Sequence, residues 1–213
     1  MKRCLALRVP CKHDLATNCH CNTGCANISS VKFAVERLGK QVTVSDDLAV
    51  IQQADKVFLP GVGSANAAMA SIEKKQLISC IQGLTQPVLG ICLGMQLMVE
   101  KSEESLADNT PCLGLMPGQV KRMQVGDLRL PHMGWNTVTP IDNAPLFKGI
   151  DVGSYFYFVH SFAVAVSDLT MASCQYGMDF SAAIYLDNYF GVQFHPERSS
   201  DAGAQLLKNF IDL

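Results

Sequence analysis

The chain has 213 residues and a formal net charge of −2, with 48% hydrophobic and 17% charged residues. This length buries most of the unfolded surface in one large or two small domains, and the composition excludes a disordered chain and a strongly basic nucleic-acid binder. Because no apolar run approaches the ~20 residues of a membrane-spanning helix, we expect a cytoplasmic protein that contacts neither nucleic acid nor membrane.

The start of the chain is rich in cysteine. Five of the nine cysteines fall within the first 25 residues: Cys4, Cys11, Cys19, Cys21 and Cys25. A disulfide framework is disfavoured, because the count is odd, the chain is not small and no secretory apolar segment follows Met1. Zinc is also disfavoured, because Cys19-His20-Cys21 with Cys25 lacks the paired C-x-x-C spacing of zinc knuckles. We therefore expect no metal site.

From residue 26 onward, helical and strand patterns alternate. We expect helices at 27–38, 65–84 and from 93 onward, a further helix capped by the polar residues at 45–47, and strands at 41–44, 56–59 and 87–91. Continuous apolar strands between helices predict a parallel sheet that is covered on both faces.

Beyond residue 110 the pattern changes to shorter strands, followed by a closing helix at 202–211. The expected strands lie at 119–123, 136–138, 154–159, 171–176, 182–185 and 190–194. No linker or repeat separates the two halves. The sequence therefore predicts an α/β fold with a mostly parallel central sheet and extra short antiparallel strands in its second half.

One cysteine lies in a pattern that carries chemistry. The strand at 87–91 runs into Gly90-Ile91-Cys92-Leu93-Gly94, which is the nucleophile-elbow pattern with Cys in place of Ser. The glycines allow a sharp turn that projects the Cys92 thiol, and the following helix N-terminus favours the thiolate. The amide of Leu93 is placed to stabilise an oxyanion. The alternative, a buried structural cysteine, is the interpretation that we prefer for Cys80 and Cys174.

A thiolate nucleophile needs a base and a group that orients this base. Extended residues two apart point the same way, so His195 and Glu197, which follow the strand at 190–194, are expected to lie side by side. The carboxylate would then hold the tautomer of the imidazole. A histidine and a glutamate two residues apart most often lie at a protein surface. Together with the elbow at Cys92, they predict a Cys-His-Glu triad.

The turn Pro60-Gly61-Val62-Gly63 ends another predicted parallel strand, so it opens on the same edge of the sheet as Cys92. Its backbone N–H groups would supply a second oxyanion donor. From this segment alone, an ordinary strand-to-helix turn is an equally good interpretation.

These motifs resemble those of the class I, or triad, glutamine amidotransferases, through residues 90–96 and 194–197. Four further segments resemble the glutaminase subunits of imidazole glycerol phosphate synthases, which act in histidine biosynthesis: residues 59–63, 131–136, 157–161 and 193–198. The resemblance covers residues 23–213 and implies the α/β fold of that family.

The resemblance also implies a reaction that uses no cofactor. Cys92 would attack the side-chain amide of L-glutamine, His195 would carry the proton and Glu197 would orient His195. A glutamyl thioester forms, ammonia leaves, and water releases glutamate. The oxyanion hole would comprise Val62, Gly63 and Leu93, and the residues that match glutamine-binding positions are Gly61, Gln96, Glu104, His160 and Ser161.

Two of these assignments depend on the resemblance. From the residues alone, Gln96 is a solvated helix residue and Glu104 is part of a charged helix end. Phe162 replaces the tyrosine that is more frequent in the family, which removes a hydroxyl from the glutamine site.

The same resemblance implies a partner, a (β/α)₈-barrel cyclase subunit that forms a heterodimer with this chain. The cyclase would use the ammonia to make imidazole glycerol phosphate and an aminoimidazole carboxamide ribotide. Trp135, Asn136 and Arg198 match positions that face the cyclase. An aromatic anchor is a common interface hot spot, although a core tryptophan is nearly as good an interpretation of Trp135.

Two other functions compete with this one. Another amidotransferase, or a γ-glutamyl hydrolase, would share the elbow and the triad but serve a different acceptor. A metal-binding or scaffolding module built on the N-terminal cysteines would need neither. The segments at 131–136 and 157–161 favour the cyclase-linked glutaminase.

Residues 1–22 depart from the family pattern, in which an apolar strand runs directly into a turn like that at 23–27. Residues 18–22 are poor material for the interior of a parallel sheet, and residues 5–9 are the alternative strand. Read one base later, the codons for 18–22 encode Ile or Thr and Val or Ala. We therefore hypothesise a shifted reading frame over 1–22, before an amidotransferase domain at 23–213. If the segment is genuine, we expect the sheet to lack its normal first strand.

Overall fold

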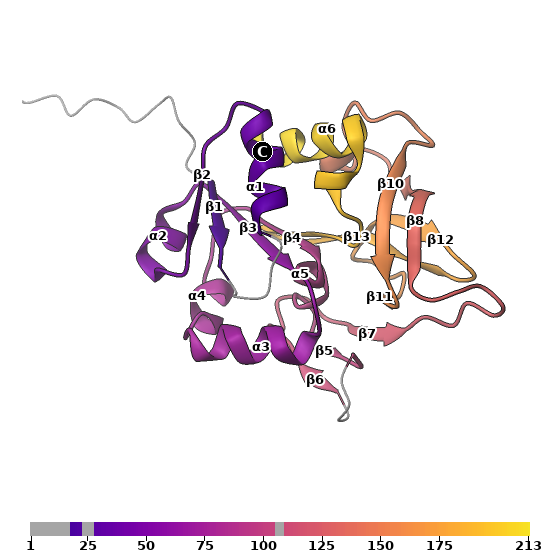
Figure 1. Cartoon of the computed structure of the whole chain (residues 1–213), viewed down its shortest axis with the longest axis horizontal. Helices are drawn as coiled ribbons and strands as arrows, with labels where there is room; N and C mark the ends of the chain where they lie inside the picture. Colours follow the sequence, from indigo (N-terminus) through magenta and orange to yellow (C-terminus); the bar gives the residue numbers. More distant parts are fainter. Residues whose placement is uncertain (1–17, 23–27, 105–108) are drawn as a thin grey trace, which may run out of the picture.

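The computed structural model describes residues 18–22, 28–104 and 109–213. Its central sheet has eight strands in the order β2-β1-β3-β4-β14-β13-β12-β9 (Figure 1). The parallel part consists of β2 (Val42–Ser45), β1 (Asn18–Cys21), β3 (Lys56–Gly61), β4 (Val88–Cys92) and β14 (Tyr189–Val192). The antiparallel part consists of β13 (Asp179–Leu186), β12 (Thr170–Gln175) and β9 (Thr139–Pro140). The predicted mostly parallel sheet is confirmed.

Helices cover both faces of the sheet. Figure 1 shows α1 (Ile28–Arg37) and α6 (Ser200–Ile211) on one face, and α3 (Ala65–Lys74) and α4 (Ile78–Gln82) on the other. Strand residues alternate between the two apolar layers. In β3, Phe58 packs with α1 and α6, whereas Val57 and Leu59 pack with α3 and α4.

The second half of the chain adds two small sheets. One pairs β8 (His132–Thr137) with β10 (Tyr155–His160) in antiparallel register. The other has four short strands in the order β11 (Phe162–Val164), β7 (Gln119–Arg122), β5 (Lys101–Ser102) and β6 (Thr110–Pro111). Two 3₁₀ helices, η1 (Pro145–Phe147) and η2 (Pro196–Arg198), complete the connections.

Local hydrogen bonds explain where two of the expected helices begin or end. The helix after 45–47 is α2 (Leu48–Gln53), and Asp47 caps it as predicted by accepting from the amide of Ala49 at 2.8 Å. The single helix expected at 65–84 is wrong, because α3 and α4 are separate. Gln76 has a φ of 56°, and the amide of Leu77 donates to the carbonyl of Ile72 at 3.0 Å. This is a Schellman ending, which the sequence hides because glutamine stands where glycine is usual.

The expectation that the sheet lacks its first strand is also wrong. β1 lies between β2 and β3, pairs in parallel with both, and is buried at all four positions. Its two parallel neighbours satisfy the backbone polar groups of this buried strand, and a free cysteine packs as a small apolar residue. The alternative strand at 5–9 and the turn at 23–27 lie outside the described residues.

The alternating geometry of β1 separates its possible metal ligands. Cys19 and Cys21 pack into the apolar layer of α3 and α4, whereas His20 meets the ring of Phe58 with centroids 5.0 Å apart. Phe58 belongs to the opposite layer, so these three side chains do not converge on one ion. The described residues contain no cluster of three or more metal-ligating side chains. They also include no helix with the length and hydropathy of a membrane span.

Candidate active site

The elbow at the end of β4 has the sharp geometry that its glycines predict. Cys92 has a φ of 54°, in the left-handed region that is unfavourable for a side chain. A Cβ on Gly90 would come within 2.7 Å of the backbone nitrogen of Met95, and one on Gly94 would overlap the carbonyl oxygen of Leu59. Only glycine at both positions lets this turn pack against β3.

The helix behind the elbow is shorter than expected. The sequence predicts a helix from residue 93 onward, but α5 (Leu93–Gln96) is a single turn. Because a helix dipole sums over aligned peptide units, one turn contributes little to a thiolate at Cys92.

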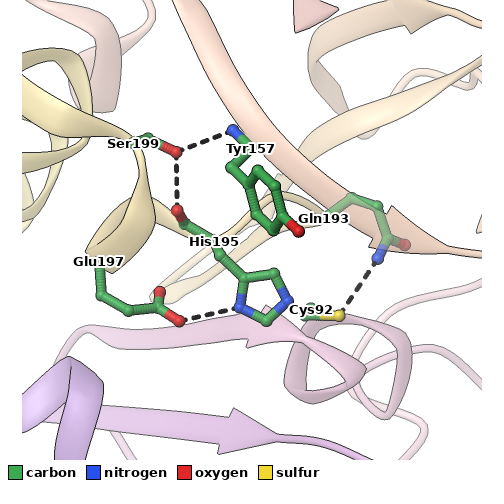
Figure 2. Close-up of polar contacts among 6 residues, drawn as sticks. All are labelled: Cys92, Tyr157, Gln193, His195, Glu197 and Ser199. Carbon is green, nitrogen blue, oxygen red and sulfur yellow. Dashed lines mark hydrogen bonds and ion pairs between the residues drawn. The ribbon is translucent and has the colours of Figure 1, made fainter. Parts of the chain in front are cut away.

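The candidate base and its orienting acid lie side by side after β14. The Nδ1 of His195 is 2.9 Å from Oε1 of Glu197, and their side chains are 9% and 3% exposed. Figure 2 shows the His195 ring between Glu197 and Cys92, and no described residue hydrogen-bonds its buried Nε2. Burial is the largest single influence on the His195 pKa and lowers it. Cys92 and Glu197 act in the opposite direction and together raise this pKa to about 10, so the site favours an imidazolium.

A serine holds the backbone of His195. Ser199 is 1% exposed; its hydroxyl donates to the carbonyl of His195 at 2.7 Å and accepts from the amide of Tyr157 at 3.0 Å (Figure 2). The amide of His195 in turn donates to the carbonyl of Tyr157 at 2.8 Å. His195 is therefore tied to β10 through three hydrogen bonds. Our sequence reasoning did not identify Ser199.

A cavity of about 230 Å³ opens beside the thiol of Cys92. The cavity brings together most of the predicted residues with two others, Val159 and Phe162; the predicted ones are Val62, Gly63, Cys92, Leu93, Gln96, Glu104, His160, Ser161 and His195. Gly61 does not line it. A Cβ at Gly61 would lie 2.9 Å from the nitrogen of Gly94, so this glycine permits the close packing of β3 against the elbow.

Two polar side chains, Glu104 and Gln96, line the cavity and can hydrogen-bond a ligand. Glu104 has a buried Oε2 without a partner among the described residues, and burial raises the pKa of this carboxyl. Gln96 uses its Nε2 twice, donating to the carbonyl of Phe162 and to Oε1 of Gln193, both at 2.9 Å. Because both amide hydrogens are committed, Gln96 can offer a ligand only its carbonyl oxygen. The interpretation of Gln96 as a solvated helix residue is wrong, since it is 4% exposed.

His160 belongs to a buried relay. Its Nδ1 lies 2.8 Å from the carbonyl of Phe162 and its Nε2 lies 3.1 Å from Nδ1 of His132. The carbonyl can only accept, so His160 carries its proton on Nδ1 and His132 donates to it. Burial is the main cause that lowers the pKa of His160 to about 3 and that of His132 to about 4. Both rings are therefore neutral near pH 7.

Of the three residues predicted at a partner interface, Trp135 and Arg198 lie beside Tyr157, whereas Asn136 makes other contacts. Trp135 is 51% exposed, which rules out the core interpretation, and its ring stands edge-on to Tyr157 with centroids 6.0 Å apart. The guanidinium of Arg198 lies 5.8 Å from the centroid of the same Tyr157 ring. Asn136 instead donates to the carbonyl of Gln175 at 2.9 Å and lies 3.4 Å from Nε2 of His132. It supports the relay from within.

Comparisons with known proteins agree with this geometry. The model of the class-I glutamine amidotransferase family matches residues 23–213. The imidazole glycerol phosphate synthase subunit HisH of Colwellia psychrerythraea is 57% identical over 210 residues, covering 93% of this chain and 93% of that protein. The HisH subunit of Vibrio cholerae is 58% identical over 195 residues, covering 90% and 96% of the two chains.

A solved structure shares the fold at much lower identity. PurLQS from Thermotoga maritima superposes with a TM-score of 0.67 and 17% identity, over 93% of this chain and 99% of that one. The chain therefore belongs to the class-I glutamine amidotransferase family, and within it resembles the HisH subunits of imidazole glycerol phosphate synthase.

Proposed function

We propose that this chain is the glutaminase subunit of an imidazole glycerol phosphate synthase. The observation that carries the proposal is the Cys92-His195-Glu197 arrangement beside a small cavity, in a chain more than half identical to HisH subunits. Glutamine is hydrolysed to glutamate and ammonia here, and the ammonia passes to a (β/α)₈-barrel cyclase subunit in a heterodimer. We expect the complex to work in the cytoplasm.

The first half of the reaction forms a thioester. The Cys92 thiolate attacks the side-chain carbonyl carbon of glutamine, and negative charge develops on its oxygen. Backbone amides of Val62, Gly63 and Leu93 would stabilise this oxyanion. The imidazolium of His195, held by Glu197, gives its proton to the leaving nitrogen, so that the carbon–nitrogen bond breaks and ammonia departs.

The second half returns the enzyme. His195, now neutral, takes a proton from a water molecule as this water attacks the thioester carbonyl. The carbon–sulfur bond breaks, glutamate leaves and the thiolate is restored. Both halves of the reaction need His195 in the same position. The three hydrogen bonds that tie His195 to β10 agree with this need.

Glutamine recognition would use the polar groups of the cavity. The buried carboxyl of Glu104 has an unused oxygen that suits the α-ammonium group. The free carbonyl of Gln96 can accept from the side-chain amide of the substrate. The segment of His160 and Ser161 lines the cavity and would hold the α-carboxylate end. Phe162 has no hydroxyl group, so its side chain makes no hydrogen bond to glutamine.

The cyclase subunit would use the ammonia in its own reaction. The cyclase subunit, rather than this chain, carries out the lyase step that yields imidazole glycerol phosphate and aminoimidazole carboxamide ribotide. The exposed Trp135, the half-buried Tyr157 and Arg198 form a cluster that would contact the cyclase.

The test is Cys92→Ala in the presence of the cyclase subunit and its nucleotide substrate, with glutamate release as the measurement. We expect the variant to lose about 10⁴-fold or more in kcat, as for removal of other covalent nucleophiles. Cys112→Ala is the matched control, because Cys112 lies outside the cavity, and it should keep full activity. Unchanged turnover in Cys92→Ala would contradict the proposal, and high activity of the wild-type chain without cyclase would favour a stand-alone hydrolase.

A further inference from the structure

A fully buried glutamine touches the nucleophile. Gln193 follows β14 directly and is 0% exposed. Its Nε2 lies 3.7 Å from Sγ of Cys92, within the range of an N–H···S hydrogen bond, and Figure 2 shows the amide pointing at the sulfur. No step of the proposed thioester reaction uses this contact.

The orientation of the Gln193 amide is determined by its neighbours. Gln96 donates one N–H to the carbonyl of Phe162, which can only accept, and its second N–H to Oε1 of Gln193. If the Gln193 amide were flipped, two NH₂ groups would face each other. The hydrogen bond from Gln96 therefore directs the N–H of the Gln193 amide, rather than its carbonyl oxygen, toward Cys92.

A donor at this place has a chemical use. Cys92 is 9% exposed, so little water is available to solvate its sulfur, and the single turn of α5 adds little dipole. A hydrogen bond to the charged form of a group stabilises that form. The sulfur is most negative as the attacking thiolate and as the thiolate that leaves the thioester, so one donor assists both halves of the reaction.

We propose that Gln193 is a catalytic residue that stabilises the Cys92 thiolate by hydrogen bonding, and that Gln96 is a positioning residue that orients the Gln193 amide toward the sulfur. This inference rests on the proposed role of Cys92 as the nucleophile. It gives Gln96 a second task beside the substrate contact of its carbonyl oxygen.

The experiment is Gln193→Met, which keeps the length of the side chain and removes its donor. The variant is assayed as the complex with the cyclase subunit. The alkylation rate of Cys92 by iodoacetamide is measured against pH, following the peptide that contains Cys92 by mass spectrometry. We expect the pH midpoint of alkylation to rise by about one unit and kcat to fall about tenfold, with KM within about twofold of the wild type.

The matched control is Ser181→Ala. Ser181 is also 0% exposed, but it hydrogen-bonds Thr170 and Ala165 instead of the site, so its loss should leave the alkylation midpoint in place. An unchanged midpoint in folded Gln193→Met, or a change in KM alone, would overturn the inference.

A second variant covers a failure of Gln193→Met to fold. Gln193→Leu is uncharged, has a similar reach and offers the sulfur no donor. Its alkylation midpoint should also rise, and an unchanged midpoint would be fatal to the inference. Activity of the wild type together with loss of activity in Cys92→Ala would sustain the proposed function even if both Gln193 variants behaved like the wild type.

Discussion

Ser199 contributes to the site at the scale of a single residue. Its hydroxyl joins the carbonyl of His195 to the amide of Tyr157, and both bonds are buried or partly buried. The carbonyl of His195 also accepts from the amide of Arg198 at 3.0 Å. The serine therefore acts on the triad by holding the main chain that carries His195.

We expect Ser199→Ala to lower the free energy of unfolding by about 1–3 kcal/mol, because it removes two hydrogen bonds, including the one that the amide of Tyr157 donates to the hydroxyl. We also expect kcat to fall several-fold while glutamine KM changes little. Urea unfolding and the glutaminase assay with cyclase would measure the two effects. Ser154→Ala removes an exposed hydrogen bond to Asp151 and should affect neither. Full activity and stability in Ser199→Ala would contradict the holding role.

β1 shows how a whole element can accept unsuitable side chains. His20 is fully buried, and no described residue hydrogen-bonds either of its ring nitrogens. Burial, with a smaller effect of Lys32, lowers its pKa to about 4 from an ordinary value of 6.5, and the backbone of Ile28 opposes this shift only weakly. The folded chain thus disfavours the proton, so the contribution of His20 to stability is retained above pH 6.5 and lost as the pH falls toward 4.

We therefore expect His20→Val to raise the free energy of unfolding at pH 7 by about 1–2 kcal/mol, because it removes an unsatisfied buried polar group. The gain should be larger at pH 5, with a pH slope reduced by up to ~1.4 kcal/mol per unit. Urea unfolding at both pH values measures this. Thr43→Val, at an exposed position of β2, should leave the slope unchanged. Equal slopes in His20→Val and the wild type would count against the account.

The chemistry of β1 also bears on the shifted-frame hypothesis for residues 1–22. The alternative frame encodes Ile or Thr in place of His20, and a β-branched residue such as Ile is what the buried strand position favours. The hypothesis stays a prediction. Sequencing the DNA around codons 1–25 and weighing the intact protein would test it, and an intact mass that matches the printed sequence would refute it.

At the scale of the whole molecule, the small sheet of β8 and β10 presents an apolar face. Its exposed side chains are Met133 at 63%, Trp135 at 51% and Tyr155 at 59%. Val159 pairs with Met133 across the two strands and also lines the active-site cavity. The face therefore reaches the cavity beside Cys92, which agrees with our proposal that the cyclase docks here.

We expect Trp135→Ala to weaken cyclase binding by about 2 kcal/mol, or roughly 30-fold in Kd, since aromatic anchors dominate interfaces of this kind. Calorimetric titration with the cyclase subunit measures the change, and the stability of the free chain should remain close to that of the wild type. Ile141→Ala is the control, because Ile141 is 58% exposed but lies in the loop after β9. Equal weakening by both variants would argue against a specific role of the tryptophan.

The elbow around Cys92, the adjacency of His195 and Glu197, and the cap at Asp47 could be predicted from the sequence. Each depends on residues close in the chain, whose spacing and backbone freedom determine the local geometry. The mostly parallel sheet was predictable for the same reason, since continuous apolar strands between helices have few other arrangements.

Other features were decided only by tertiary structure. The end of α3 at Gln76 and the single turn of α5 depend on how these segments pack. The tautomer of His160 depends on His132, and the donor at Cys92 depends on Gln96 and Gln193, which are 97 positions apart. β1 became a strand because two parallel neighbours supplied its backbone hydrogen bonds. The sequence by itself determined the catalytic motifs and the class of fold, because these follow from near-neighbour sterics and apolar pattern. The side-chain partners around the motifs required the fold, because only packing brings distant polar groups within hydrogen-bond distance.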